Sequence, residues 1–428
     1  MPTATAPPSA PPGPEANVLA QTVAFHRDPL GFLRRAQQRF GDAFQVRLLT
    51  ARPTFVAAAP EAIEALLDAD PGRARAGEAR RAVLPFASAR SVFGGDAGAH
   101  RAASARIAPA LAPEAIDSRR ERIAAIAERH ASGWPTGRPF RLLSRLRTLC
   151  DEVFVRLVLG VRDEETAREL TAAVGRMLRT PGNPPLTLPG RGDGLVGELG
   201  EALFRQRQGP VAEALSRAVA ARRADPGGEV DVLGCMVGSG AGLTGGEVVD
   251  ELTSLLMAAQ EPPSIALAWI LDRLAREPEL AEAFVDDPRG ERAGAVVRET
   301  LRLRPPASGS LRKLLEPLPV GEHVLPAGAT VLASTALAHH DPRGFADPDR
   351  FQPERWLAGS PGWPFFPFGG GARRCVGEAL AQAEIEAIVP AVLRALKLTP
   401  VSPVPERMVQ RATVLVPQRS LMVRASRR

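Results

Sequence analysis

The sequence predicts a mainly α-helical fold with small β-sheets, and three patterns support that prediction. Helical periodicity runs from about Ala99 to Gly160, and a second helical pattern runs from Thr244 to about Arg276. Strand-like alternation is confined to short stretches, and residues 408–425 near the C-terminus show it most clearly. Long helices with a few short strands favour a fold with a helical core.

Shorter elements and loops precede the long helices. Residues 1–16 are rich in Pro and Ala and are therefore expected to be disordered. Residues 28–41 and 59–70 predict short amphipathic helices, with two short strands between them. The stretch Thr180–Gly200 is dense in Pro and Gly, which predicts a mobile loop and not a domain boundary. Residues 17–428 are expected to form a single domain.

The longest predicted helix begins at Thr244, where Glu247 stands three residues later, as in a capping box. If this helix continues to Arg276, it is roughly 50 Å long and crosses a whole domain, because each residue adds 1.5 Å. Further along the chain, residues 322–342 predict a β-hairpin.

Composition argues against several classes of protein. The net charge is only +6, and no dense basic run with interleaved aromatic residues appears, so nucleic-acid binding is not expected. The 3 cysteines are too scattered for a disulfide framework or a zinc site, which fits a reducing cytoplasm. Nowhere do about 20 apolar residues run together, so no membrane span is expected.

One cysteine lies in an unusual setting. The stretch FPFGGGARRCVGEAL places Cys375 between a glycine-rich loop and the start of a helix. Glycines let backbone N–H groups approach a sulfur, and the helix N-terminus with Arg373 and Arg374 predicts a lowered pKa for the thiol. These features alone leave three possibilities open, namely a metal ligand, a nucleophile and a small buried hydrophobe.

The spacing in this stretch resembles the haem-thiolate loop of the cytochrome P450 family. The match is F-x-x-G-x-R-x-C-x-G, formed by Phe368, Gly371, Arg373, Cys375 and Gly377. Two further segments, ETLR and FQPERW, resemble the family's E-x-x-R and F-x-P-x-R elements in the expected order. They supply the three residues that resemble the structural triad behind the haem: Glu299, Arg302 and Arg355.

The resemblance implies the cytochrome P450 fold, with haem b held between the long central helix and the cysteine loop. It implies that Cys375 is the proximal ligand of the iron and that the cysteine thiolate favours O–O cleavage. It also implies that Phe368 lies against the porphyrin.

Three residues match family positions that contact the haem propionates: His100, Arg312 and Arg373. The family's H-x-x-x-R pattern has Ser104 where its arginine is expected. Arg101 or Arg106 is therefore a candidate to replace the missing cation.

The long helix also departs from the family pattern A-G-x-(E/D)-T-T, whose acid and alcohol relay protons. The matching run is AAQEPPS, in which Glu261 keeps the acid, Pro262 replaces the threonine and Ala259 replaces the glycine. Because proline has no N–H, Pro262 and Pro263 are expected to kink the helix and to free the carbonyls of Ala258 and Ala259. Glu261, a water on those carbonyls or a substrate hydroxyl then supplies the proton path. The alternative is that the prolines only bend the helix and Glu261 is solvated or ion-paired.

The resemblance implies a haem-thiolate monooxygenase that oxidises an apolar small molecule with O2. A separate ferredoxin-type donor and its reductase are expected to supply electrons, with Arg374 in a basic docking patch. The bacterial style suggests a cytoplasmic, monomeric enzyme that tailors secondary metabolites. Loss of the threonine leaves other possibilities open: peroxide-driven turnover, oxidative cyclisation or rearrangement, and a haem-binding relative without catalysis.

Overall fold

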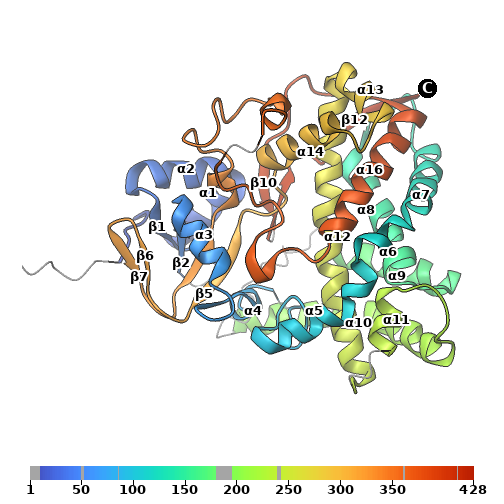
Figure 1. Ribbon diagram of the computed structural model, residues 1–428, viewed down its shortest axis with the longest axis horizontal. Helices are drawn as coiled ribbons and strands as arrows, with labels where there is room; N and C mark the ends of the chain where they lie inside the picture. The colour runs from blue at the N-terminus through green and yellow to red at the C-terminus, as the bar shows by residue number, and fades with distance from the viewer. Residues whose placement is uncertain are drawn as a thin grey trace, which may run out of the picture.

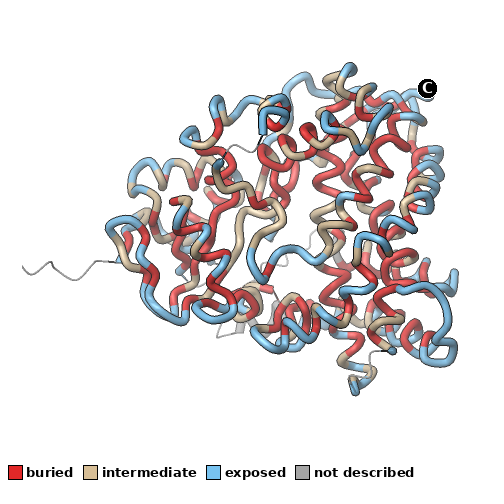
Figure 2. Tube along the Cα trace, in the orientation of Figure 1, coloured by how far each residue is buried: buried red, intermediate tan, exposed pale blue. Residues whose placement is uncertain are grey.

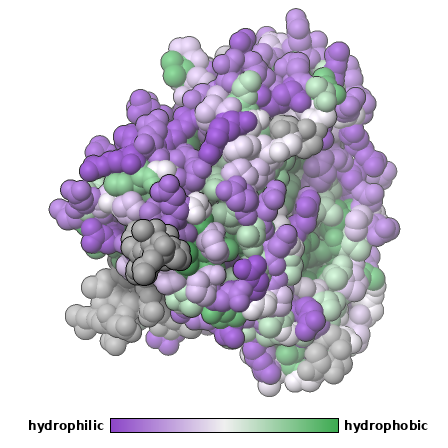
Figure 3. All heavy atoms as spheres, turned by 60° about the vertical axis from the view of Figure 1, so that its left-hand side comes forward, coloured by the Kyte–Doolittle hydropathy of each residue, from purple (hydrophilic) through white to green (hydrophobic). Residues whose placement is uncertain are grey.

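The computed structural model describes residues 10–49, 53–84, 86–179, 195–238, 242–359, 362–411 and 413–428. A β-rich part and a larger helical part lie side by side, and a long loop passes between them (Figure 1). The prediction of a mainly α-helical fold with small sheets is confirmed. Most of the surface is hydrophilic, and hydrophobic residues show mainly toward the middle of the face in Figure 3.

The β-rich part is built on a five-stranded sheet with the order β1-β2-β8-β5-β3. Its strands are β1 (Ala43–Val46), β2 (Thr54–Ala57), β3 (Ala74–Arg75), β5 (Ser310–Leu314) and β8 (Thr330–Ala333). Strands β2 and β8 run parallel, and the other neighbours are antiparallel. The two strands predicted between residues 41 and 59 are therefore confirmed as β1 and β2.

The predicted hairpin at residues 322–342 is wrong. Strand β7 (His323–Leu325) pairs with β6 (Leu318–Val320), whereas β8 joins the main sheet between β2 and β5. A hairpin would give β8 a partner on one side only. The main sheet pairs its backbone on both sides and buries Val331 and Ala333 completely.

Two smaller sheets complete the strands. They contain β4 (Phe140–Arg141), β9 (Leu396–Pro400) and β12 (Met422–Arg427) in one sheet, and β10 (Met408–Arg411) and β11 (Val414–Pro417) in the other. The alternation predicted over residues 408–425 thus forms the hairpin β10–β11 and most of β12.

The first helices run along the chain to residue 238. They are α1 (Val18–Arg27), α2 (Pro29–Phe40), α3 (Pro60–Asp68), α4 (Ala76–Arg81), α5 (Ala97–Leu111), α6 (Pro113–Asp117), α7 (Arg120–Ser132), α8 (Leu142–Val153), the π-helix η1 (Phe154–Val158), α9 (Glu164–Arg179), α10 (Leu195–Ala224) and α11 (Val232–Gly238). Helices α2 and α3 confirm the two short helices predicted from the sequence.

The remaining helices include the central one. They are α12 (Gly245–Arg276), α13 (Pro278–Asp286), α14 (Glu291–Leu303), α15 (Thr335–Ala338), the 3-10 turns η2 (Pro353–Trp356) and η3 (Gly371–Arg373), and α16 (Glu378–Ala395). Helix α12 packs against α8, α10, α14 and α16.

Two predictions of loose structure fall partly outside the described residues. Of the predicted loop Thr180–Gly200, residues 180–194 lie outside, and Leu195–Gly200 form the start of α10. Of the predicted disordered segment 1–16, residues 1–9 lie outside. Within the rest, the Pro12 carbonyl accepts a hydrogen bond of 2.8 Å from the backbone N–H of Gln45 in β1.

The central helix begins where its capping box predicts. The Thr244 hydroxyl accepts a hydrogen bond from the Glu247 N–H, and the Glu247 carboxylate accepts one from the Thr244 N–H. The helix then continues without a break through Pro262 and Pro263 to Arg276. Among the described residues, no helix is both long enough and apolar enough to cross a membrane.

Candidate active site

The loop that carries Cys375 passes between the two parts of the molecule. In Figure 2 it is an exposed and half-buried stretch between buried segments on either side. Gly371 adopts a φ of +59°, and a Cβ there would lie 2.2 Å from the carbonyl oxygen of Leu67 in α3. The backbone N–H of Cys375 donates to the Phe368 carbonyl at 2.9 Å. The glycine therefore lets the loop pass close to α3, and the turn brings Phe368 and the cysteine together.

Cys375 is accessible to solvent, although many protein atoms lie close to its sulfur. Burial raises its pKa, as does Glu378, although a backbone hydrogen bond at Gly377 and the charges of Arg80 and Arg374 lower it. The net direction is upward, so the predicted lowering is wrong for the metal-free thiol. Desolvation exceeds the effects of the helix start and the arginines. A metal ion would supply the charge that holds the thiolate, because a coordinating thiol is deprotonated.

The triad predicted from ETLR and FQPERW comes together behind this loop. The carboxylate of Glu299 accepts from Nε and Nη2 of Arg302, both at 2.8 Å, and from Nε of Arg355 at 3.3 Å. Glu299 and Arg302 are both fully buried. Trp356, whose role the sequence did not predict, donates its Nε1–H to Glu299 at 2.9 Å.

Helix α12 has a distinct face near its middle. Ala258, Ala259, Pro262 and Pro263 are each half-buried, whereas residues 251–257 before them and residues 264–272 after them are all buried. Glu261, in the same segment, is half-buried as well. Apart from Glu261, the half-buried residues of this segment are small and apolar.

The acid of this segment points elsewhere. Glu261 forms an ion pair with Nη2 of Arg147 on α8 at 2.5 Å. Ser264 is buried and donates its hydroxyl to the Glu261 carbonyl at 2.9 Å. The structure therefore agrees with the alternative in which Glu261 is ion-paired.

The three residues assigned to the propionates differ in their contacts. Arg373 already donates to Asp70 at 2.9 Å, to the Gly95 carbonyl at 2.7 Å and to Asp96 at 3.0 Å. Its hydrogen bonds lock the cysteine loop to the segments before α4 and α5. Asp70 and Asp96 gave no signal in the sequence.

The other two residues differ in charge and in partners. His100 lies between the carbonyls of Val92 (2.8 Å) and Ala372 (3.1 Å), and burial, with the charge of Arg373, lowers its pKa. Arg312 is buried, and its only hydrogen bond among the described residues goes to the carbonyl of Leu311. Arg312 is therefore a buried cation without a carboxylate partner in that part of the chain.

Comparison with known proteins decides the family. A sequence profile described as Cytochrome P450 matches residues 293–425. The chain is 30% identical to cytochrome P450 135B1 of Mycobacterium tuberculosis, over 97% of this chain and 91% of that protein. The chain belongs to the cytochrome P450 family. This P450 is also 28% identical to cytochrome P450 138 of Mycobacterium bovis, over 95% of this chain and 94% of that protein.

Solved structures agree in fold. Retinoic acid-bound cyanobacterial CYP120A1 superposes with a TM-score of 0.82 at 20% identity, covering 98% of this chain and 100% of that one. The heme domain of cytochrome P450DA gives 0.82 at 18% identity, covering 99% and 98%. As a family member, this P450 is a monooxygenase that binds haem b.

The residues of this chain fit that cofactor. Cys375 on the loop is not in a disulfide, and small half-buried alanines and prolines lie in the middle of α12. The buried Arg312 has no carboxylate partner among the described residues. Cys375 is the residue that would bind the iron, and Arg312 would hold a propionate. Haem, when bound, supplies the oxidising chemistry with O2.

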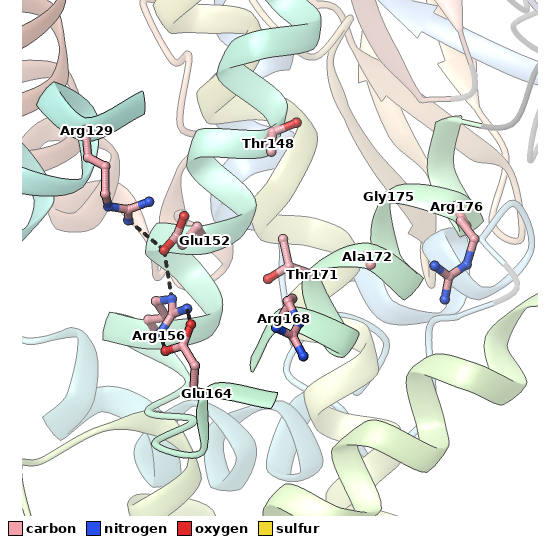
Figure 4. A pocket seen from close by; sticks show the side chains of 10 residues that line it. All are labelled: Arg129, Thr148, Glu152, Arg156, Glu164, Arg168, Thr171, Ala172, Gly175 and Arg176. Atoms are coloured by element: carbon pink, nitrogen blue, oxygen red, sulfur yellow. Dashed lines mark hydrogen bonds and ion pairs between the residues drawn. The ribbon is translucent and has the colours of Figure 1, made fainter. Parts of the chain in front are cut away.

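A separate pocket lies in the helical part (Figure 4). Its lining residues come from α7, α8, η1 and α9. One wall is an ion-pair network in which Glu152 accepts from Arg129 at 2.7 Å and from Arg156 at 2.8 Å. The hydrogen bond from His130 leads the effects that lower the pKa of Glu152 to about 2. Neither the cysteine loop nor α12 contributes to this pocket, which is therefore distinct from the haem site.

Proposed function

We propose that this P450 oxidises an apolar small molecule with O2, using electrons from a separate ferredoxin-type donor and its reductase. We place it in the cytoplasm as a monomer that tailors secondary metabolites. The observation that supports an apolar substrate is the half-buried segment in the middle of α12. Four of its residues carry neither charge nor hydroxyl, namely Ala258, Ala259, Pro262 and Pro263, and the fifth, Glu261, is ion-paired with Arg147. Small apolar walls favour a guest whose binding releases water from apolar surface.

Proton delivery is proposed to bypass side-chain acids and alcohols of α12. Glu261 is held by Arg147, and the Ser264 hydroxyl is bound to its own helix. The carbonyls of Ala258 and Ala259 remain, because the prolines four residues later have no N–H to donate to them. A water or a substrate hydroxyl bound to these carbonyls would then carry the proton.

Two substitutions at one position test this route. Pro262→Ala restores the N–H that pairs with the Ala258 carbonyl, and Pro262→Thr restores both that N–H and an alcohol. With a substrate that lacks a hydroxyl, we expect Pro262→Thr to raise product formed per electron consumed and Pro262→Ala to lower it. Glu261→Gln should leave this ratio unchanged. A several-fold fall in Glu261→Gln would restore Glu261 to the proton path.

The substrate class can be tested directly. We expect apolar small molecules to shift the ferric haem from low to high spin, and charged molecules of equal size to leave it unchanged. The reverse preference would contradict the proposal. The same assay ranks candidates for turnover with donor and reductase.

The missing alcohol also favours a second candidate reaction, turnover driven by hydrogen peroxide. Product formed with peroxide at a rate comparable to that with donor and reductase would favour it. Oxidative cyclisation or rearrangement would be recognised by the product.

Donor docking gains little from Arg374, because that exposed side chain is balanced by Glu378 in an ion pair of 2.6 Å.

A further inference from the structure

We propose that Arg80, at the end of α4, supplies the cation that α5 lacks and holds one haem propionate, while Arg312 holds the other. Arg80 would therefore be a cofactor-positioning residue. The family pattern does not predict this role, since it expects the cation at position 104, where this chain has Ser104.

The side chain of Arg80 is in an unusual position. It is half-buried, and its guanidinium carbon lies 4.5 Å from the centre of the Phe93 ring. Its Nη1 donates a hydrogen bond to the Phe93 carbonyl at 3.2 Å. Burial lowers its pKa to about 10, with Arg312 and Arg373 adding to the effect, while Asp70 and Cys375 oppose it. The charge of Arg80 thus acts at the cysteine that binds the iron.

Charges around this point do not balance. Three guanidiniums, those of Arg80, Arg312 and Arg373, influence one another at one end of the site. Two carboxylates, Asp70 and Asp96, lie with them, and both are bound by Arg373. In the described parts of the chain, no carboxylate is within ion-pair distance of Arg80 or Arg312. An unpaired charge is costly when it is buried, as in Arg312, and less so when it is half-buried, as in Arg80. The geometry therefore calls for anionic groups from a ligand, and haem b carries two.

Neither candidate on α5 fills this role. Arg101 is exposed, and the charge of Arg106 acts on Glu251 of α12 instead. The Ser104 hydroxyl lies 3.4 Å from Nε2 of His100. His100 is already engaged by the chain, because its Nδ1 lies 2.8 Å from the Val92 carbonyl and its Nε2 lies 3.1 Å from that of Ala372. Burial lowers its pKa, which disfavours the charged ring.

The neighbouring arginine shows the contrast. Arg81 donates to the Gly94 carbonyl and pairs with Asp96 at 3.4 Å, so protein groups satisfy it. Two adjacent arginines thus differ in partners, and only Arg80 is left for an anion from outside the chain.

The test combines a variant with a change in the cofactor. The full-length protein is loaded with haem b or with its dimethyl ester, whose propionates carry no charge. The rate of transfer to excess apomyoglobin is then measured for the wild type, Arg80→Gln, Arg80→Lys and the control Arg75→Gln. Arg75 is an exposed arginine at the start of α4 with a partner at 3.8 Å in Glu78.

We expect Arg80→Gln to lose haem b about ten- to hundredfold faster than the wild type, the range for a charged hydrogen bond. Arg80→Lys should recover part of this loss, and Arg75→Gln should match the wild type. Esterification should accelerate loss less in Arg80→Gln than in the wild type, because one propionate contact is already gone. A purely structural role would make the two effects multiply in full, and that result, or an unchanged rate in Arg80→Gln, overturns the proposal. Failure of the wild type to hold haem would instead contradict the cofactor assignment.

Discussion

Replacing Trp356 with Phe tests the network around Glu299. The Nε1–H of Trp356 donates to a buried carboxylate at 2.9 Å, and the residue is 7% exposed. A hydrogen bond to a charged group contributes about 1.5–3 kcal/mol to the free energy of unfolding. Trp356→Phe should therefore destabilise the fold by at least that amount.

Trp363→Phe is the matched control. Trp363 is half-buried, and its Nε1–H donates at 3.1 Å to the carbonyl of Ala338, a neutral acceptor. Loss of a neutral hydrogen bond costs about 0.5–1.5 kcal/mol, so the two variants should differ by about 1–1.5 kcal/mol. Both free energies are measured by urea unfolding of the haem-loaded protein, and their comparison requires equal slopes.

The pH dependence of the free energy of unfolding separates two effects of Trp356→Phe, namely the lost hydrogen bond to the Glu299 carboxylate and the lost packing. Burial alone would raise the pKa of Glu299, but the hydrogen bonds and charge of Arg302, with the donors of Gln352 and Trp356, lower it overall. A lowered pKa gives stability above the unfolded pKa that disappears as pH falls through the folded pKa. The cost of Trp356→Phe should therefore shrink in acid, while that of Trp363→Phe stays constant. Equal costs for the two variants at every pH would refute this reasoning.

Three further predictions concern single residues. Cys375→Ser should abolish the thiolate-type band of the reduced carbon monoxide complex; an unchanged spectrum would remove Cys375 as ligand. Gly371→Ala should greatly reduce haem loading, because a Cβ would lie 2.2 Å from the Leu67 carbonyl oxygen; normal loading would contradict it. Burial raises the pKa of Glu384 to about 8, so the native protein loses stability as pH rises from the unfolded pKa to that value. Glu384→Gln should remove this slope in urea midpoints, and parallel curves would be inconsistent with it.

Local patterns predicted what local chemistry determines. The glycine loop, the capping box at Thr244 and the pair Glu299–Arg302 each lie within a few residues, and the structure contains all three. The glycine-rich loop indicated a close backbone approach near Cys375, but only the resemblance to the family's haem-thiolate loop implied that the cysteine is a metal ligand.

Partners that are distant in sequence could not be predicted in this way. Arg373 reaches Asp70 and Asp96, which are 303 and 277 positions away. Glu261 and Arg147 are 114 positions apart, so no helical spacing indicates their pairing. Arg80 gave no signal, because an unpaired cation becomes unusual only when its burial is known. The prediction that the pKa of Cys375 is lowered was wrong for the same reason, since desolvation of the thiol depends on the fold.

The prolines of α12 connect stability to function. Each proline inside a helix costs roughly 3 kcal/mol or more, by loss of a hydrogen bond and by a clash with the preceding turn. The helix remains continuous through Pro262 and Pro263, because α8, α10, α14 and α16 pack around it. Both prolines are half-buried, and under the proposed proton route the freed carbonyls of Ala258 and Ala259 would bind water or substrate. Departures from local helix rules in natural proteins concentrate at functional sites. The surrounding bundle thus offsets a local instability at the place where the proposed proton route would use backbone carbonyls.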